Sequence, residues 1–154
     1  MALYKSVLHH RGNCLPKWLL ETIGIYVSLL NGCGYCVEHH RAGLSRLLKD
    51  EARVAAIRAA LETDSWTGIF EPGEIAILEY VGQLTRAPAQ VAETSIEALR
   101  RSGLDDGEIL EVNQVASYFA YVNRTVLGLG VTTDGDILGL SPGDSGNSDN
   151  WRHS

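Results

Sequence analysis

The sequence has few cysteines, no run of basic residues and no apolar stretch long enough to cross a membrane. Its 3 Cys are too few, and odd in number, for a disulfide framework. The net charge of -6 disfavours nucleic acid and anionic lipid as partners, because both require clustered Lys and Arg. The longest apolar stretch, residues 23–30, is too short for a bilayer. Residues 1–12 lack the apolar core of a secretory signal. These absences predict a cytoplasmic protein that binds neither membranes nor nucleic acid.

The rest of the composition indicates one helical domain. At 154 residues and 45% hydrophobic content, the chain is long enough to bury a core. Apolar residues recur at helical spacing between Pro and Gly punctuation, and no segment alternates like a strand. We expect helices at about 18–30, 34–49, 51–61, 72–86, 88–103 and 105–127. The sequence therefore predicts an all-α domain over residues 1–138, followed by a flexible tail over residues 139–154.

The most informative stretch, residues 31–40, reads NGCGYCVEHH. Two thiols stand three positions apart and an imidazole follows four positions later, so Cys33, Cys36 and His40 share one face of a helix. In a reducing cytoplasm, a close thiol pair is typical of catalysis or metal binding. Thiolates, not thiols, attack peroxides and disulfides, so catalysis requires a thiol pKa below the usual value of about 8.5.

We expect the start of this helix to lower the thiol pKa through its dipole. His40 leans toward the N-terminus of the helix and is placed to accept the Cys36 proton. Once Cys36 is oxidised to a sulfenic acid, Cys33 is close enough to displace water and form a disulfide. The pattern therefore predicts a redox pair in which Cys36 attacks and Cys33 resolves.

Glu21 is a carboxylate in the most apolar predicted helix. If the helices at 18–30 and 34–49 form an antiparallel hairpin, Glu21 lies near the His40 end of the second helix. A Glu–His–Cys proton relay is then possible. Alternatively, Glu21 stabilises only the N-terminal turns of its own helix through its charge. Both interpretations stay open at this point.

Other cysteines and polar residues have simpler interpretations. The thiol pair and His40 supply three of the four ligands of a structural zinc site, and no second pair completes the set. Cys14 has no partner in the sequence and is interpreted as an idle thiol. His39 is expected to be solvated or at an interface. Asn123 and Arg124 form a polar pair in an apolar helix. An arginine in such a helix usually binds a carboxylate or lies at an interface.

These spacings resemble a known family. The pattern is similar to the signature of the alkylhydroperoxidase AhpD-like family. It consists of Glu21, eleven residues, Cys-Gly-Tyr-Cys at 33–36, three residues and His40. That family belongs to the carboxymuconolactone decarboxylase superfamily. Residues 27–31 resemble the usual lead-in to the cysteines, and residues 118–131 resemble the branch called peroxidase-related enzymes.

The resemblance implies an all-α bundle built on a helical hairpin, assembled as a homo-oligomeric trimer or hexamer. It implies an antioxidant thiol peroxidase in which Cys36 is the peroxidatic and Cys33 the resolving thiol. His40 and Glu21 would form the proton relay. The substrate would be a small peroxide, and no cofactor would be needed beyond an external thiol or disulfide donor protein.

One position departs from the family pattern. The residue before the peroxidatic cysteine is a histidine of the relay in the well-known member, whereas this chain has Tyr35. A neutral phenol does not accept a proton at neutral pH, so we expect slower activation of Cys36. The alternatives to a peroxidase are a thiol–disulfide oxidoreductase with little peroxidase activity and a redox-sensing or zinc-binding interaction module. The decarboxylase branch generally lacks the cysteine pair.

Overall fold

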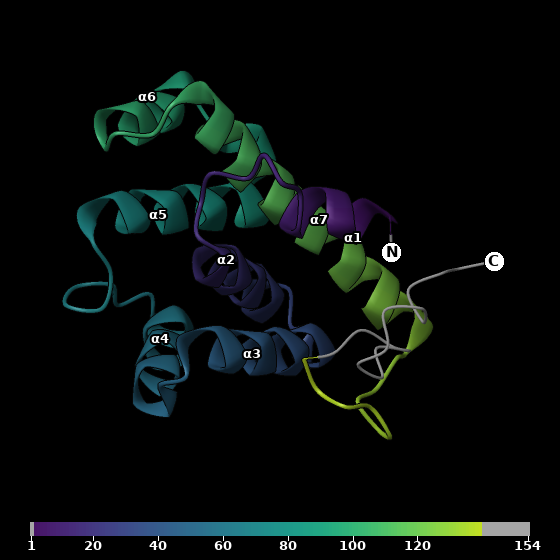
Figure 1. Ribbon diagram of the computed structural model, residues 1–154. Coiled ribbons are helices and arrows are strands. Elements are labelled where there is room, and N and C mark those ends of the chain that lie inside the picture. Colours follow the sequence, from purple (N-terminus) through teal and green to yellow (C-terminus); the bar gives the residue numbers. More distant parts are fainter. Residues whose placement is uncertain (1, 140–154) are drawn as a thin grey trace.

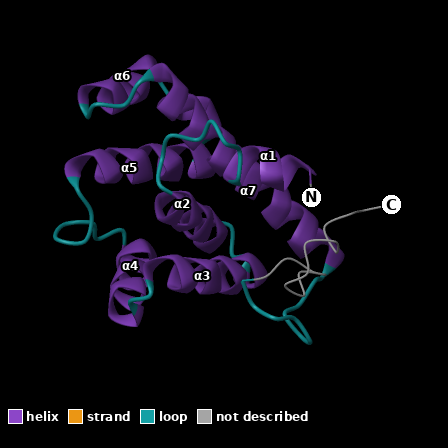
Figure 2. Cartoon of the chain, in the orientation of Figure 1, coloured by secondary structure: helices purple, strands orange, loops and turns teal. Residues whose placement is uncertain are grey.

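A computed structural model describes residues 2–139, and every regular element in this range is a helix (Figure 2). The elements are α1 (Ala2–Leu8), α2 (Lys17–Leu30), α3 (Gly34–Leu48), α4 (Glu51–Thr63), α5 (Pro72–Arg86), the 3-10 turn η1 (Pro88–Gln90), α6 (Glu93–Arg101) and α7 (Asp106–Leu129). The predicted all-α class is confirmed. Apart from Gly139, the tail expected over residues 139–154 lies outside the described residues.

Two elements differ from the expectation. The helix α1 was missed, because a helix of 7 residues is too short to show a periodic pattern. It is held by burial of Val7 and Leu8 in the core. The single helix expected over 88–103 is instead the turn η1 followed by α6, because Val91 and Ala92 are extended. Proline at position 88 suits a short turn as well as a helix start.

The other helix starts follow from local side chains. Asp50 caps α4 as expected, since its Oδ1 accepts a hydrogen bond from the Arg53 N–H at 3.0 Å. Asp105 and Glu108 form a reciprocal capping box at the start of α7. These caps satisfy backbone donors that a helix leaves unpaired at its start.

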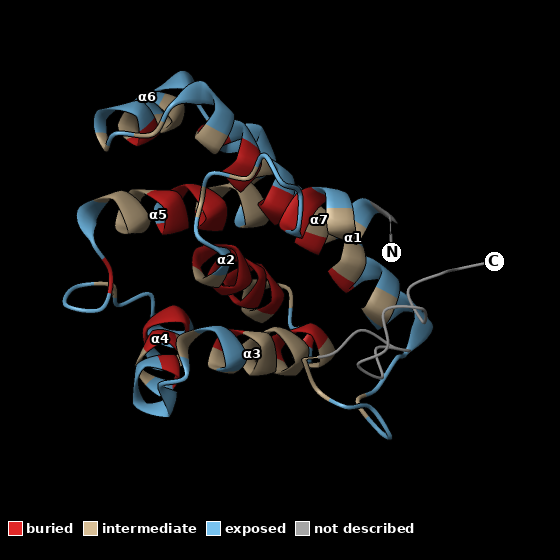
Figure 3. Cartoon of the chain, in the orientation of Figure 1, coloured by how far each residue is buried: buried red, intermediate tan, exposed pale blue. Residues whose placement is uncertain are grey.

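The helix α2 lies in the middle of the fold, packed on α3, α5 and α7 (Figure 1). Every residue from Leu19 to Ser28 is buried, and the ribbon of α2 is correspondingly almost all in the buried class (Figure 3). A helix that is apolar all round is stable in water only when other helices surround it. The sequence of α2 therefore dictates its central position.

A tight turn joins α2 to α3. Asn31 ends α2, Gly32 adopts a positive φ of 69°, and Cys33 precedes the first residue of α3. Glycine adopts this left-handed conformation without strain. The Cys33 N–H donates to the Ser28 carbonyl at 2.8 Å, which fixes the start of α3 against the end of α2. The two helices consequently form the expected hairpin.

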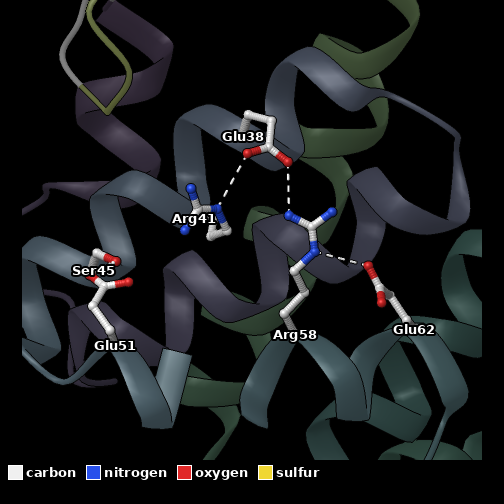
Figure 4. Close-up of polar contacts among 6 residues, drawn as sticks. All are labelled: Glu38, Arg41, Ser45, Glu51, Arg58 and Glu62. Carbon is white, nitrogen blue, oxygen red and sulfur yellow. Dashed lines mark hydrogen bonds and ion pairs between the residues drawn. The ribbon is translucent and has the colours of Figure 1, made fainter. Parts of the chain in front are cut away.

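A charged network holds the outer face of α3 to α4 (Figure 4). Arg58 of α4 donates to Glu38 of α3 at 2.8 Å and to Glu62 at 2.9 Å, while Arg41 pairs with Glu38 at 3.3 Å. The hydrogen bond from Arg58 lowers the pKa of Glu38. These pairs are one-third exposed or more, so each adds little stability. Burial of Cys36, Val37 and Leu44, more than these pairs, therefore holds α3 in the fold.

Close packing between α2 and α7 depends on Gly24. A Cβ atom at this position would overlap the ring of Phe119, which is fully buried on α7. The absence of a side chain therefore lets the two helices approach, and Phe119 fills the space on α2.

We predict that Gly24→Ala destabilises the protein by roughly 1–3 kcal/mol, because the overlap with Phe119 outweighs the gain in helix propensity. Gly128→Ala in α7 is the matched control, because no atom lies within 4 Å of a Cβ built there. The control should stabilise the helix by up to about 1 kcal/mol. Denaturant unfolding of both variants measures the difference, and equal stabilities would contradict the packing argument.

Candidate active site

Two free thiols meet at the start of α3. Cys33 is the N-cap residue and Cys36 the third residue of the helix, and their sulfur atoms are 3.0 Å apart. Cys33 is 0% and Cys36 2% exposed. Because a disulfide bond is about 2.05 Å long, the two sulfurs need to move only about 1 Å to bond. An external reagent, in contrast, has no direct access to either sulfur.

Buried polar side chains line the dithiol. Asn123 of α7 donates to the Ser28 hydroxyl at 3.0 Å and accepts from the Asn31 amide at 3.0 Å. Ser28 and Asn123 are fully buried, and both form side-chain hydrogen bonds with Cys36. The network joins the end of α2 to α7 and supplies polar contacts to a sulfur otherwise enclosed by apolar groups.

The thiol pKa is opposite to our expectation. Burial raises the pKa of Cys36, and the hydrogen bond and charge of Cys33 raise it further, whereas Asn123 and Ser28 lower it. The expectation of a lowered pKa considered the helix dipole and omitted desolvation, which is larger for a fully enclosed sulfur. In this conformation Cys36 is therefore a neutral thiol, and a base must take its proton before it can attack.

Glu21 and His40 form a short pair between α2 and α3. Glu21 Oε2 lies 2.6 Å from His40 Nδ1, and both side chains are mostly buried. A Cβ at Gly43 would lie 3.2 Å from Glu21 Oε2, so the glycine lets the carboxylate lie close to α3. The His40 ring also packs edge-on against Phe119, with ring centroids 4.5 Å apart.

This contact shows that the Glu21 carboxylate binds a histidine of the next helix, and the proton relay itself stays a prediction. With Nδ1–H donating to Glu21, Nε2 of a neutral His40 is left as the proton acceptor. The pair thus has the parts of a general base that a carboxylate orients.

A second polar cluster lies on another side of α3. Asp136, in the segment after α7, pairs with His39 at 3.2 Å between Oδ2 and Nε2. The ring of Tyr35 lies over His39 with centroids 4.4 Å apart. Burial raises the pKa of Tyr35 to about 12, and a hydrogen bond to Asp136 contributes. The His39 side chain is only 11% exposed, which disfavours a solvated residue, while its expected place at an interface stays a prediction.

The structure adds residues that the sequence pattern did not assign to the site. Ser28 and Asn31 fall in the segment just before the cysteines, and Asn123 is a polar residue in an apolar helix. The sequence therefore indicated each of them weakly as a site residue. Asp136 had none, because its contacts join residues 97 positions apart. Arg124 binds no carboxylate among the described residues and donates to the Ala120 carbonyl instead. Cys14 is exposed and lies outside the dithiol.

Two further findings concern the part of the chain that the structure describes. No group of three or more His, Cys, Asp or Glu side chains in this part is placed to hold a metal ion. No helix in residues 2–139 is both long and apolar enough to cross a membrane.

Comparison with known proteins gives the fold its name. No family model matches the sequence. The uncharacterized protein YdfG of Bacillus subtilis (strain 168) is 27% identical over an alignment of 114 residues, and the match covers 71% of this chain and 72% of that protein. A crystal structure described as an alkylhydroperoxidase AhpD core, an uncharacterized peroxidase-related protein from Ralstonia eutropha JMP134, matches with a TM-score of 0.73. The two sequences are 23% identical, and the match covers 97% of this chain and 70% of the Ralstonia chain. This chain has the AhpD fold.

Two other solved structures share the AhpD fold of this chain. An uncharacterized peroxidase-related protein from Silicibacter sp. TM1040 matches with a TM-score of 0.75 and 24% identity over 85% of this chain. The debrominase Bmp8, in complex with 2,3,4-tribromopyrrole, matches with a TM-score of 0.71 and 18% identity. The chain spans 66% of the length of each, just under two thirds. At such low sequence identity the similarity shows a shared fold and not a shared activity. The names of these two proteins indicate that the fold supports different reactions.

The raised pKa of Cys36 predicts a loss of stability at high pH. Its folded pKa lies above the unfolded value of about 8.5, so folding favours the protonated thiol and this contribution is complete below that pH. It is lost as pH rises from about 8.5 toward the folded pKa. We expect the free energy of unfolding of the reduced protein to fall between about pH 8.5 and 10, before tyrosines ionise.

Cys36→Ser should flatten this slope, and Cys14→Ser, which removes an exposed thiol, should leave it unchanged. Denaturant titrations at several pH values under reducing conditions measure the slopes. The same slope in the wild type and in Cys36→Ser would show that burial of Cys36 does not control the pH dependence.

Proposed function

We propose that this protein is a thiol-dependent peroxidase that removes small peroxides in a reducing cytoplasm. The observation that carries the proposal is the pairing of Cys33 with Cys36 at 3.0 Å on the same helix that pairs His40 with Glu21 at 2.6 Å. A dithiol with a carboxylate-oriented base is the set of groups that two-electron peroxide reduction requires. The AhpD fold and its peroxidase-related neighbours support this function.

In the first half-reaction, His40 Nε2 takes the proton of the Cys36 thiol. The thiolate attacks one peroxide oxygen, so a sulfur–oxygen bond forms as the oxygen–oxygen bond breaks. The leaving oxygen takes the proton back from His40 and departs as an alcohol or water. Cys36 is thereby oxidised to a sulfenic acid, and the peroxide is reduced by two electrons.

In the second half-reaction, the Cys33 sulfur attacks the sulfenic sulfur of Cys36. A disulfide forms, and the hydroxyl leaves as water with the proton of Cys33. An external dithiol, which we expect to be a donor protein, then reduces the disulfide by thiol–disulfide exchange and is itself oxidised. This cycle needs no bound cofactor.

Glu21 has two effects in this cycle. Its carboxylate fixes the His40 tautomer that leaves Nε2 free to accept the proton. It also stabilises the imidazolium that forms when His40 holds the proton, because a carboxylate within hydrogen-bond distance favours the charged ring. This assistance offsets the high pKa that burial gives Cys36.

We also propose that the protein works as a homo-oligomer, a trimer or a hexamer. Large apolar side chains are exposed near the end of α7 and just after it. The exposed residues are Tyr121, Leu127, Leu129 and Val131. A group of exposed apolar residues on one region of the surface is typical of an interaction face between subunits.

The roles of the two cysteines predict different outcomes for their variants. Cys36→Ser should abolish peroxide consumption, because no nucleophile remains. Cys33→Ser should stop turnover after one equivalent of peroxide and leave a sulfenic acid on Cys36, because the resolving thiol is gone. Dimedone labelling with peptide mass mapping detects this species.

Cys14→Ser is the matched control and should keep full activity. A sulfenic acid on Cys33 in the Cys36→Ser variant would reverse the roles. Turnover with disulfides but not with peroxides would replace the peroxidase with a thiol–disulfide oxidoreductase. Stoichiometric zinc in the reduced protein would favour the zinc-binding module.

The relay predicts that Glu21→Gln and His40→Gln each lower kcat/KM for peroxide by about 10²-fold or more, the usual contribution of a positioned general base. The double variant should be little worse than either single one, because the two residues act as one unit. Glu38→Gln is the control, since this carboxylate is on the outer face of α3 and binds Arg58. Steady-state kinetics across pH measures the effects, and additive losses would contradict a shared role.

A further inference from the structure

The dithiol is closed in this structure. Cys33 and Cys36 are 0% and 2% exposed, so even a small reagent reaches them only after some neighbouring group moves. Two of their neighbours, Ser28 on α2 and Asn123 on α7, are themselves fully buried. Moving these side chains would disrupt the core and its hydrogen bonds, so opening through them is costly.

Tyr35 is a neighbour of a different kind. It is only half-buried, stands between the two cysteines in the sequence, and lies next to Cys36 in the first turn of α3. Its ring stacks on His39, and its hydroxyl binds Asp136, which also pairs with His39. One carboxylate therefore holds both aromatic side chains in place on this side of the dithiol.

Asp136 belongs to residues 131–139, which we call the C-terminal strap. The strap crosses back from the end of α7 to α3 (Figure 1). Polar contacts tie it to α3, from Asp136 to His39 and from Arg46 to the Leu138 carbonyl. Its apolar residues Val131 and Ile137 are 44% and 70% exposed. A segment fixed by a few polar contacts and little apolar burial separates from the fold more easily than a packed helix.

We propose that Tyr35 controls access to the dithiol and that the C-terminal strap, through Asp136, holds it in the closed position. A small peroxide enters during brief movements of the tyrosine ring. The larger disulfide or dithiol group of a donor protein requires release of the strap. The strap thus separates the peroxide half-reaction from the donor half-reaction. The separation of the two half-reactions rests on the proposed function, whereas the control of access to the two thiols does not.

Thiol labelling tests access without requiring turnover. The reduced protein, in a Cys14→Ser background, reacts with two neutral reagents that differ in size, methyl methanethiosulfonate and the bulkier 4,4′-dithiodipyridine. In each case a cysteine thiolate attacks the reagent sulfur, a mixed disulfide forms and a sulfinate or a pyridinethione leaves. Rates are followed by intact mass and by release of the pyridinethione.

Asp136→Ala should accelerate labelling by the bulky reagent about tenfold, the effect of losing its hydrogen bonds to Tyr35 and His39. The small reagent should be accelerated much less. Tyr35→Phe should act in the same direction as Asp136→Ala, because it loses the hydroxyl that binds the strap. Thermal midpoints should match the parent protein, since the strap contributes little to the core.

Asp134→Ala is the matched control. Asp134 lies in the same strap and carries the same charge, but its hydrogen bonds are to Thr132 and not to α3. Its labelling rates should equal those of the parent protein. Equal acceleration by Asp134→Ala would assign the effect to charge and overturn the proposal.

Three other results would also overturn it. Unchanged rates in Asp136→Ala would show that the strap does not hold the site closed. Equal acceleration of both reagents would indicate a more reactive thiol in place of wider access. Acceleration in Tyr118→Ala but not in Asp136→Ala would place the entrance on the side of α1, where Tyr118 packs on Tyr4. Failure to consume peroxide, with labelling as expected, would reject the peroxidase and leave the access proposal standing.

Discussion

The contact between Gly24 and Phe119 sets the spacing and register of α2 and α7, and the candidate site depends on it. One helical turn beyond Gly24 on α2 is Ser28, and one turn beyond Phe119 on α7 is Asn123. The fit of the Phe119 ring against Gly24 therefore brings the Ser28 hydroxyl to 3.0 Å from the Asn123 amide, directly beside Cys36. The same ring lies edge-on to His40. Apolar packing thus positions both the polar lining of the dithiol and its histidine.

The local part of the site could be predicted from the sequence. The spacing of Cys33, Cys36 and His40 lies within one helix, and the short turn at Gly32 fixes the hairpin that brings Glu21 to His40. Such relations depend on helix geometry and on a turn of three residues, which the sequence shows directly. The AhpD-like resemblance covers the same segment, and the fold agrees with it.

The remainder depends on long-range contacts. Asp136 reaches His39 from a segment without helical periodicity, so no local pattern indicated it. The pKa of Cys36 was misjudged for a related reason, since burial is a property of the whole fold and here exceeds the effect of the helix start. Two extended residues, Val91 and Ala92, divide a predicted helix in a region where the composition itself suits a helix.

Adjacent histidines on α3 have separate carboxylate partners. His40 faces α2 and binds Glu21 in the hairpin, whereas His39, about 100° away around the helix, binds Asp136 of the strap. The inner pair is enclosed between two helices, as the proposed proton transfer requires. The outer pair joins α3 to the strap, where a contact can be broken without disturbing the core.

The position of both thiols within a single turn of α3 has a consequence for how oxidation affects the molecule. Cys33 precedes the helix and Cys36 is in its first turn, so a bond between them links atoms that are already neighbours on one element. Gaining or losing two electrons then moves the two sulfurs by only about 1 Å and requires little structural reorganisation. The oxidised and reduced molecules would have nearly the same shape, and a donor protein would distinguish them by contact with the sulfurs themselves.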